Sequence, residues 1–330
     1  MKYFTEPKGR FVIKVPTEWQ YKNIEVGHEE ASPYSFQLYE NSVGAFQISC
    51  YSAEEKPIAS HVKMQQADTS NLEFLKSRMD GGGFNMHLWH AAVEGHLLMA
   101  KYIYDTDKAN DPKVLEELNK AEAALTTLLL ISESKRQLAI DLNKYENFMA
   151  SLGASYDLKW KALENKSFIE FLVVVANQID AFLRMAIVLK KQIDNKSNNV
   201  DVSLLFQGEN DSAVMERKIY SQAKMLGIIS EENYVELERL YKERNKVIHR
   251  YIISDFKTLY LYKIALDYET ICEEMRMKLK NVEDIQFRDG IGIYGGKDPN
   301  YEPDDSDKQF LFSQVNDKHL IKELKRIIGN

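Results

Sequence analysis

The sequence predicts two structural classes in one chain: an α+β N-terminal domain, built on an antiparallel sheet with helices, followed by an all-α helical bundle. Short runs of β-branched and aromatic residues, separated by turn residues, occur before residue 110. From Arg136 onward, segments with apolar residues at helical spacing take their place. A length of 330 residues allows each part a hydrophobic core of its own.

Residues 1–135 contain the strand signals. Five runs predict strands, at residues 11–15, 35–39, 45–51, 87–93 and 96–104. A short helix is predicted at residues 71–76, between the β regions. Asp111 as N-cap and Pro112 at the first helical position predict a longer helix that reaches about residue 134.

Helical periodicity divides the rest of the chain into three parts. Residues 136–162 form a helical connector, in which a helix is predicted to end at Gly153. Residues 163–282 form an antiparallel bundle with helices predicted at 165–194, 213–226, 230–252 and 254–280. Residues 283–330 form a C-terminal extension with a short helix. The elements predicted in this extension are a hairpin at 286–294 and the helix at 314–328.

Composition indicates a globular protein of the cytoplasm. The net charge of −7 argues against a general coat of nucleic acid, because non-specific affinity comes from Lys and Arg that neutralise phosphates. Cys50 and Cys272 fall in different predicted domains, which argues against a disulfide framework and fits a reducing compartment. The N-terminus lacks the core of a signal peptide, and polar residues interrupt the apolar segment 168–189. No membrane partner is therefore expected.

One polar stretch, residues 241–251, lies near the end of a predicted bundle helix. Tyr241, Asn245 and His249 follow one another at four-residue spacing and so share one stripe of that helix. Arg244 falls on the adjoining apolar stripe. A guanidinium there needs a partner or an open cleft, because burying it unpaired costs several kcal/mol. Two adjoining stripes of a helix that together carry Arg, Asn and His predict a functional site.

Arg244-Asn245-x-x-x-His249 resembles the R-x(4–6)-H motif of the HEPN superfamily, and Tyr251 corresponds to the aromatic residue that often follows its His. The resemblance covers residues 163–282. It implies a helical bundle that dimerises so that two motifs meet. Many HEPN proteins are metal-independent endoribonucleases, so the implied catalytic residues are Arg244, Asn245 and His249, with no metal and no cofactor.

The implied reaction is attack of a ribose 2′-OH on the adjacent phosphate, which leaves a 2′,3′-cyclic phosphate. His249 serves as general acid/base, Arg244 neutralises the charge that builds on the phosphorane, and Asn245 orients the phosphate or the imidazole. Basic neighbours favour phosphate steering, although the same pattern is common on a solvated face. The accessory residues are Tyr241, Lys246, Arg250 and Tyr251 from this stretch and Asp180 from the apolar segment.

Two of these residues have ordinary structural alternatives. HEPN domains often carry an acidic residue and an Arg in the helix that holds Asp180 and Arg184. The alternative is an ion pair one helical turn long at the edge of the core. For Arg244 the alternative is a surface pair with Glu243 or Glu238.

The first half of the chain carries a second resemblance. Val15-Pro16-x-x-Trp19, with the order of strands, hairpin and helix, is similar to PsbP/Mog-like α+β domains. This resemblance implies a small binding or scaffolding module over residues 1–135.

These patterns predict a cytoplasmic endoribonuclease that acts on RNA in phage defence or as a toxin. A homodimer through the helical domain is expected, and an antitoxin or a regulatory protein is a further candidate partner. The alternative is an interaction protein, in which the HEPN-like bundle is an inert scaffold and the N-terminal module binds a partner or a small ligand.

Overall fold

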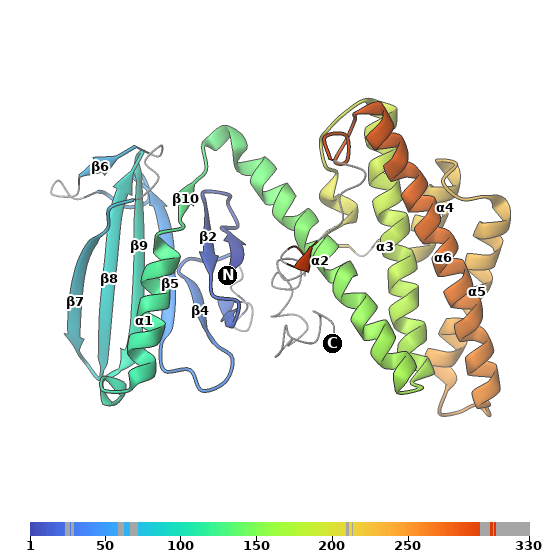
Figure 1. Cartoon of the computed structure of the whole chain (residues 1–330), viewed down its shortest axis with the longest axis horizontal. Coiled ribbons are helices and arrows are strands. Elements are labelled where there is room, and N and C mark those ends of the chain that lie inside the picture. The colour runs from blue at the N-terminus through green and yellow to red at the C-terminus, as the bar shows by residue number, and fades with distance from the viewer. Residues whose placement is uncertain are drawn as a thin grey trace. The chain divides into compact units, whose positions relative to one another are not determined.

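The computed structural model describes residues 1–23, 27, 30–58, 63–66, 72–208, 211–212, 214–297, 304–305 and 307. The chain divides into two compact units, the first spanning Met1–Asn143 and the second beginning at Lys144. Every strand among these residues belongs to the first unit, and the second unit is helical (Figure 1). The predicted change from an α+β part to a helical part is therefore confirmed.

A large sheet forms most of the first unit. Its strand order is β3-β4-β5-β9-β8-β6, and β7 pairs with β8 outside this path. Its strands are β3 (Trp19–Tyr21), β4 (Tyr34–Leu38), β5 (Ala45–Ser52), β6 (Met64–Gln65), β7 (Leu75–Gly81), β8 (Phe84–Val93) and β9 (His96–Asp105). The pairs are antiparallel except β6 with β8. The four predicted strands that fall in this sheet are present with small shifts of their ends.

A second, three-stranded sheet has the order β1-β2-β10, formed by β1 (Lys2–Thr5), β2 (Phe11–Val15) and β10 (Leu129–Leu130). Alternate residues of β2 are buried, as a strand with one face on the core requires. Helix α1 (Pro112–Leu125) adds buried side chains such as Ala121 to the same core. Its N-cap is Asp111, whose side chain accepts a hydrogen bond from the backbone N–H of Lys113, as predicted.

Two predictions for the first unit are wrong. No helix forms within the described part of residues 71–76, because Leu75 and Lys76 begin β7 and pair with His90 and Trp89 of β8. Sheet pairing here overrides a local helical preference. Helix α1 ends at Leu125 instead of near residue 134, since the chain turns there and adds β10 to the edge of β2.

The second unit contains α3 (Phe168–Asn195), α4 (Glu216–Met225), α5 (Glu231–Arg250) and α6 (Thr258–Asp289), together with most of α2 (Arg136–Glu164). The four predicted bundle helices are thus present. Helix α3 packs along α6 (Figure 1). Helix α3 contains an apolar window that is long enough to cross a membrane, and 78% of that window is buried inside the structure. The apolar character of α3 is accounted for by its place in the core.

Three boundaries in the helical part differ from the prediction. Helix α2 does not end at Gly153 but continues to Glu164, because packing of buried residues such as Ala154 offsets the roughly 1 kcal/mol helix penalty of glycine. Helix α6 begins at Thr258, not at residue 254. It also continues to Asp289, so the first residues of the predicted hairpin at 286–294 are helical. The fully buried Gln286 lies inside α6 and donates to the carbonyl of Leu189, 3.0 Å away.

Gly290 ends α6 in the left-handed conformation, at φ +66°. The predicted short helix at 314–328 lies outside the described residues.

Candidate functional site

Helix α5 presents the motif at its C-terminal end. It begins at a capping box in which the Ser230 hydroxyl accepts from the backbone N–H of Asn233 at 3.2 Å. Leu237, Leu240 and Val247 are its buried residues and fix the face that packs on the core. The helix ends at Arg250, so the motif occupies its last turns, as the sequence predicted.

Arg244 turns inward from α5 toward α4. Its side chain is 13% exposed, and its Nη1 donates to Glu216 Oε2 at 2.8 Å. Nη2 donates to Asn245 Oδ1 at 3.2 Å, and the guanidinium lies 5.0 Å from the ring centre of Tyr241. The Nε atom is buried and has no hydrogen-bond partner among the described residues. Burial lowers the pKa of Arg244, and the charge and hydrogen bond of Glu216 together with the nearby Tyr268 and Tyr220 raise it, so the pKa is raised overall.

The surface pairs with Glu243 or Glu238, which were the alternative for Arg244, do not form. Glu238 instead accepts three hydrogen bonds from Arg217, at 2.6 to 2.9 Å. Glu243 accepts from Lys246 at 2.7 Å and from the hydroxyl of Tyr260. Both carboxylates are therefore engaged elsewhere, and the partner of Arg244 comes from α4.

Glu216 is the residue that sequence reasoning missed. It lies 28 positions before Arg244 and resembles any acidic residue in the first turn of a helix. Its other carboxylate oxygen accepts a hydrogen bond from the hydroxyl of Tyr220, whose pKa is raised mainly by burial. Only the packing of α4 beside α5 brings Glu216 to the motif.

Asp180 and Arg184 on α3 form the expected intrahelical ion pair, with Nε to Oδ2 at 2.5 Å. Arg184 also donates to the carbonyls of Leu204 and Val214, at 3.1 and 2.9 Å, and so anchors the segment between α3 and α4. Burial raises the pKa of Asp180, and the charges of Arg184, Glu216 and Arg244 also act on it. The pair thus has a structural role, and the charge of Asp180 also interacts with the charges of Glu216 and Arg244.

We call the residues that contact Arg244 or interact with its charge, together with Arg184, the Arg244 cluster. Its members are Asp180, Arg184, Glu216, Tyr220, Tyr241, Arg244, Asn245 and Tyr268. Within the described part of the chain four buried polar side-chain atoms lack a hydrogen-bond partner, and three of them belong to this cluster. They are Asp180 Oδ1, Arg244 Nε and the hydroxyl of Tyr268. Unpaired buried polar atoms are rare in folded proteins and indicate strain, bound water or a place for a ligand.

His249 makes none of the hydrogen bonds of this cluster. Its side chain is exposed, and it makes no hydrogen bond with the described residues. Five positions along a helix correspond to a rotation of about 140°, which separates His249 from Arg244 on the surface of α5. Lys246 and Arg250 are also exposed. Within one chain Arg244 therefore contacts Tyr241 and Asn245, and no contact with His249 is present among the described residues.

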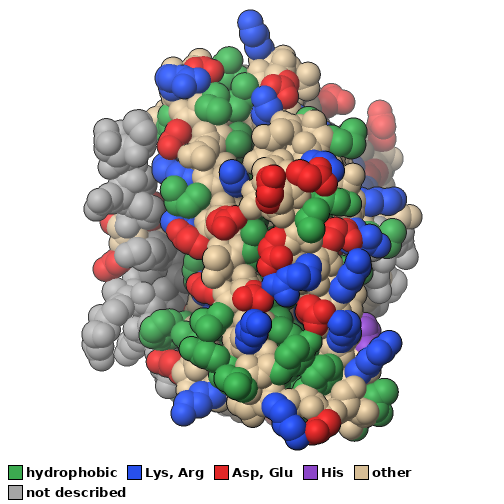
Figure 2. Space-filling model, turned by 90° about the vertical axis from the view of Figure 1, so that its right-hand side faces the viewer, with side chains coloured by type: hydrophobic (Ala, Val, Ile, Leu, Met, Phe, Trp, Pro, Cys, Tyr) green, Lys and Arg blue, Asp and Glu red, His purple; other side chains and the backbone are tan. Residues whose placement is uncertain are grey.

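The surface around His249 is both apolar and basic. Figure 2 shows hydrophobic side chains gathered with Lys and Arg in the lower part of this side, where α5 ends and α6 begins. We call this surface the α5–α6 end. Its exposed hydrophobic residues are Ile248, Tyr251, Ile252, Ile253, Leu259, Tyr262 and Leu266. Its exposed cations are Lys242, Lys246, Arg250, Lys257 and Lys263.

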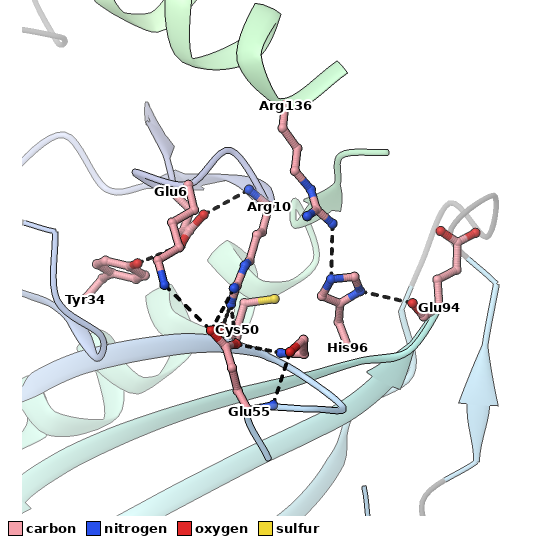
Figure 3. A network of polar contacts seen from close by, with 10 residues as sticks. Glu6, Arg10, Tyr34, Cys50, Glu55, Glu94, His96 and Arg136 are labelled. Carbon is pink, nitrogen blue, oxygen red and sulfur yellow. Dashed lines mark hydrogen bonds and ion pairs between the residues drawn. The ribbon is translucent and has the colours of Figure 1, made fainter. Parts of the chain in front are cut away.

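The first unit holds a separate polar network, drawn in Figure 3. Arg10 donates to both carboxylate oxygens of Glu55, at 2.7 and 2.9 Å, and to the carbonyl of Cys50 at 2.8 Å. Glu6 is 1% exposed, and it accepts from the backbone N–H of Arg10 and the hydroxyl of Tyr34, at 2.9 and 2.7 Å. Burial raises the pKa of the Cys50 thiol to about 12, which keeps it in the unreactive protonated form.

The same figure shows an arginine–histidine contact at the start of α2. Arg136 Nη2 lies 3.1 Å from His96 Nε2, and His96 Nδ1 lies 3.0 Å from the carbonyl of Glu94. This arrangement requires a neutral imidazole that donates through Nδ1 and accepts through Nε2. Among the described residues no group of three or more His, Cys, Asp or Glu side chains is placed to hold a metal ion.

Comparison with known proteins gives no family for this chain. No protein-family model matches it, and no curated protein matches it. Among solved structures, a crystal structure from Bacteroides thetaiotaomicron VPI-5482 at 1.50 Å resolution aligns over 53% of this chain and 76% of that chain. The identity is 15% and the TM-score 0.28, a likeness too low to define the fold or the function.

Proposed function

We propose that the chain is a metal-independent endoribonuclease of HEPN type, with residues 163–282 as its HEPN-like bundle. The observation that carries this proposal is the place of Arg244, Asn245 and His249 in the last turns of α5, beside an exposed basic surface. A helix end that carries exposed cations and an exposed imidazole suits a substrate that contains phosphate groups. Phage defence or toxicity in the cytoplasm is the setting that the HEPN resemblance implies.

His249 has the freedom that a general acid/base needs. Its imidazole is exposed and not held by a hydrogen bond to the described residues, so it can accept a proton from a ribose 2′-OH. The oxygen then attacks the adjacent phosphorus, the bond from phosphorus to the 5′-oxygen breaks, and His249 returns the proton to the leaving 5′-oxygen. The products are a 2′,3′-cyclic phosphate and a free 5′-hydroxyl. Arg244 stabilises the extra negative charge of the phosphorane, and Asn245 holds the guanidinium in place.

A homodimer supplies what one chain lacks. His249 and Arg244 lie on different faces of α5, so two copies that meet at the α5–α6 end would bring additional motif residues to one substrate. Ile252 and Ile253 are 95% and 81% exposed, and contiguous exposed apolar surface marks interaction sites. Burial of this surface between two copies favours the dimer.

The direct test is incubation of the purified protein with tRNA and mRNA in EDTA. Wild-type protein is expected to cut RNA and leave 2′,3′-cyclic phosphate ends, and His249→Ala to lose the activity by at least a hundredfold. His90→Ala, which removes an imidazole from the first unit, serves as the control. Full cleavage by His249→Ala would remove His249 from the mechanism.

A second candidate function is that of an interaction protein with an inert bundle. The observation that favours it is the Arg244–Glu216 pair, which engages the guanidinium inside the chain. In that case Arg244→Ala and His249→Ala leave partner binding unchanged and RNA is never cut. A pull-down with these two variants beside the EDTA assay separates the two functions.

A further inference from the structure

We infer that the Glu216 carboxylate occupies the place of a phosphate on Arg244, so that an RNA phosphate must displace it before the site binds substrate. The ligand's identity as RNA rests on the proposed function. We call the ion pair between Arg244 and Glu216 the latch, and its existence rests on the geometry of these two side chains.

A carboxylate and a phosphate oxygen bind a guanidinium in the same way. Both accept charge-assisted hydrogen bonds from its planar N–H groups. Glu216 Oε2 accepts from Nη1 of Arg244 at 2.8 Å, and the two side chains are 14% and 13% exposed. The carboxylate therefore fills the position of an anionic ligand within the chain.

The latch leaves hydrogen-bonding capacity unused. Arg217 and Glu238, which also join α4 to α5, form a two-pronged pair through Nε and Nη2. Arg244 reaches Glu216 through Nη1 alone, and its buried Nε has no partner in the part of the chain that the structure describes. A phosphate has more acceptor oxygens than Glu216 offers, and one that used both Nε and an Nη group would satisfy the orphaned donor.

Glu216 has a second contact that holds it when the latch opens. The hydroxyl of Tyr220 donates to its other oxygen, from one turn further along α4. Displacement by phosphate therefore separates Glu216 from Arg244 without leaving the carboxylate unpartnered.

The experiment compares Glu216→Gln with Glu238→Gln. Both remove one negative charge, and both free an arginine between α4 and α5, so general electrostatics act alike on the two variants. The probe is a single-stranded 2′-O-methyl RNA oligonucleotide, which binds but lacks the attacking hydroxyl. Fluorescence anisotropy should give an affinity about tenfold higher for Glu216→Gln than for Glu238→Gln, because one charged hydrogen bond no longer competes.

Equal affinity of the two folded variants overturns the latch. Circular dichroism checks the fold, and Glu216→Asp provides a second variant that keeps the charge but shortens its reach. This variant is expected to bind the probe more tightly than wild type. If Glu216→Gln binds the probe more tightly but no variant cuts ordinary RNA, the latch is supported and the nuclease function is rejected. If wild type cuts RNA but Glu216→Gln shows no gain in affinity, the nuclease function is supported and the latch is rejected.

Discussion

Arg10 in the first unit and Arg244 in the second are buried to the same extent yet differ in how their guanidinium groups are used. Each side chain is 13% exposed, and each pairs with a carboxylate. Arg10 binds both oxygens of Glu55 and also the carbonyl of Cys50. Arg244 binds one oxygen of Glu216, and its Nε remains unpartnered.

The difference separates an arginine that fixes structure from one that can hold a ligand. The hydrogen bonds of Arg10 tie β5 to the turn that follows it, and no buried atom of Arg10 is orphaned. In the Arg244 cluster three buried polar atoms of the described residues lack a partner, one of them Arg244 Nε itself, and the neighbouring carboxylate is the one that we propose a phosphate replaces. Partner geometry therefore distinguishes the two roles, whereas burial does not.

The largest expected effect is on stability at Arg244. Arg244→Ala leaves Glu216 buried without its counter-charge, which should lower the free energy of unfolding by about 3 kcal/mol. Adding Glu216→Gln should recover about half of that loss, because the unpaired charge is then gone. Urea unfolding followed by circular dichroism at 222 nm, which reports the helices, measures both changes.

A loss below about 1 kcal/mol for Arg244→Ala would place the pair in the class of exposed ion pairs. The Arg244–Glu216 pair would then contribute no more to the unfolding free energy than the exposed ion pairs of α5. Arg239→Ala, which breaks the exposed contacts to Glu236 and Asp267, is the matched control on the same helix.

Arg10→Ala should have a smaller effect, about 1 to 2 kcal/mol. Glu55 is 37% exposed, so losing its counter-charge costs little, and the main loss is the hydrogen bond to the carbonyl of Cys50. Hydrogen exchange of the β5 amides reports this change locally. A loss as large as that of Arg244→Ala contradicts the ranking of the two sites.

The Arg10 pair should also show in the pH dependence of stability. The hydrogen bonds from Arg10 hold the pKa of Glu55 at about 2, below its ordinary value of 4.5. A carboxyl whose pKa is lowered by folding stabilises the protein above the unfolded value and loses that contribution as pH falls through the folded value. The stability difference between wild type and Glu55→Gln should therefore shrink between pH 4.5 and pH 2.

A difference that stays constant down to pH 2 would show that Glu55 acts through packing and not through its charge. Thermal unfolding at several pH values is sufficient for this comparison.

The smallest effect on folding is expected at the α5–α6 end. Ile252→Ser together with Ile253→Ser should change the unfolding free energy by no more than about 0.5 kcal/mol, because both side chains are already in solvent. The same change should weaken self-association, measured by sedimentation at micromolar concentration. Unchanged association would exclude these isoleucines from the dimer contact.

Local patterns were enough to predict most of the elements. The alternation of β2 and the periodicity of α3 to α6 can be recognised in sequence because one face of each is buried. β7 carries no such pattern, since all of its residues are exposed and Lys76, Arg78 and Asp80 lie within it. Its existence depends on pairing with β8, which periodicity does not report.

The candidate site was predictable only in part. Arg244, Asn245 and His249 could be chosen from their spacing, and the need of Arg244 for a partner followed from its place on the apolar seam. Glu216 could not be chosen, because its role is created by the contact of α4 with α5. The five-residue spacing, in contrast, already places Arg244 and His249 about 140° apart around the helix.

One binding measurement tests the central claim that Arg244 holds a phosphate and Arg10 does not. The affinity for a 2′-O-methyl RNA oligonucleotide is measured against salt for wild type, Arg244→Gln and Arg10→Gln, each checked for its fold. Arg244→Gln should bind at least tenfold more weakly than wild type. Its salt slope should be smaller by about 0.7, the value of one single-strand phosphate contact. Arg10→Gln should match wild type, and equal binding by all three proteins would show that Arg244 does not hold a phosphate.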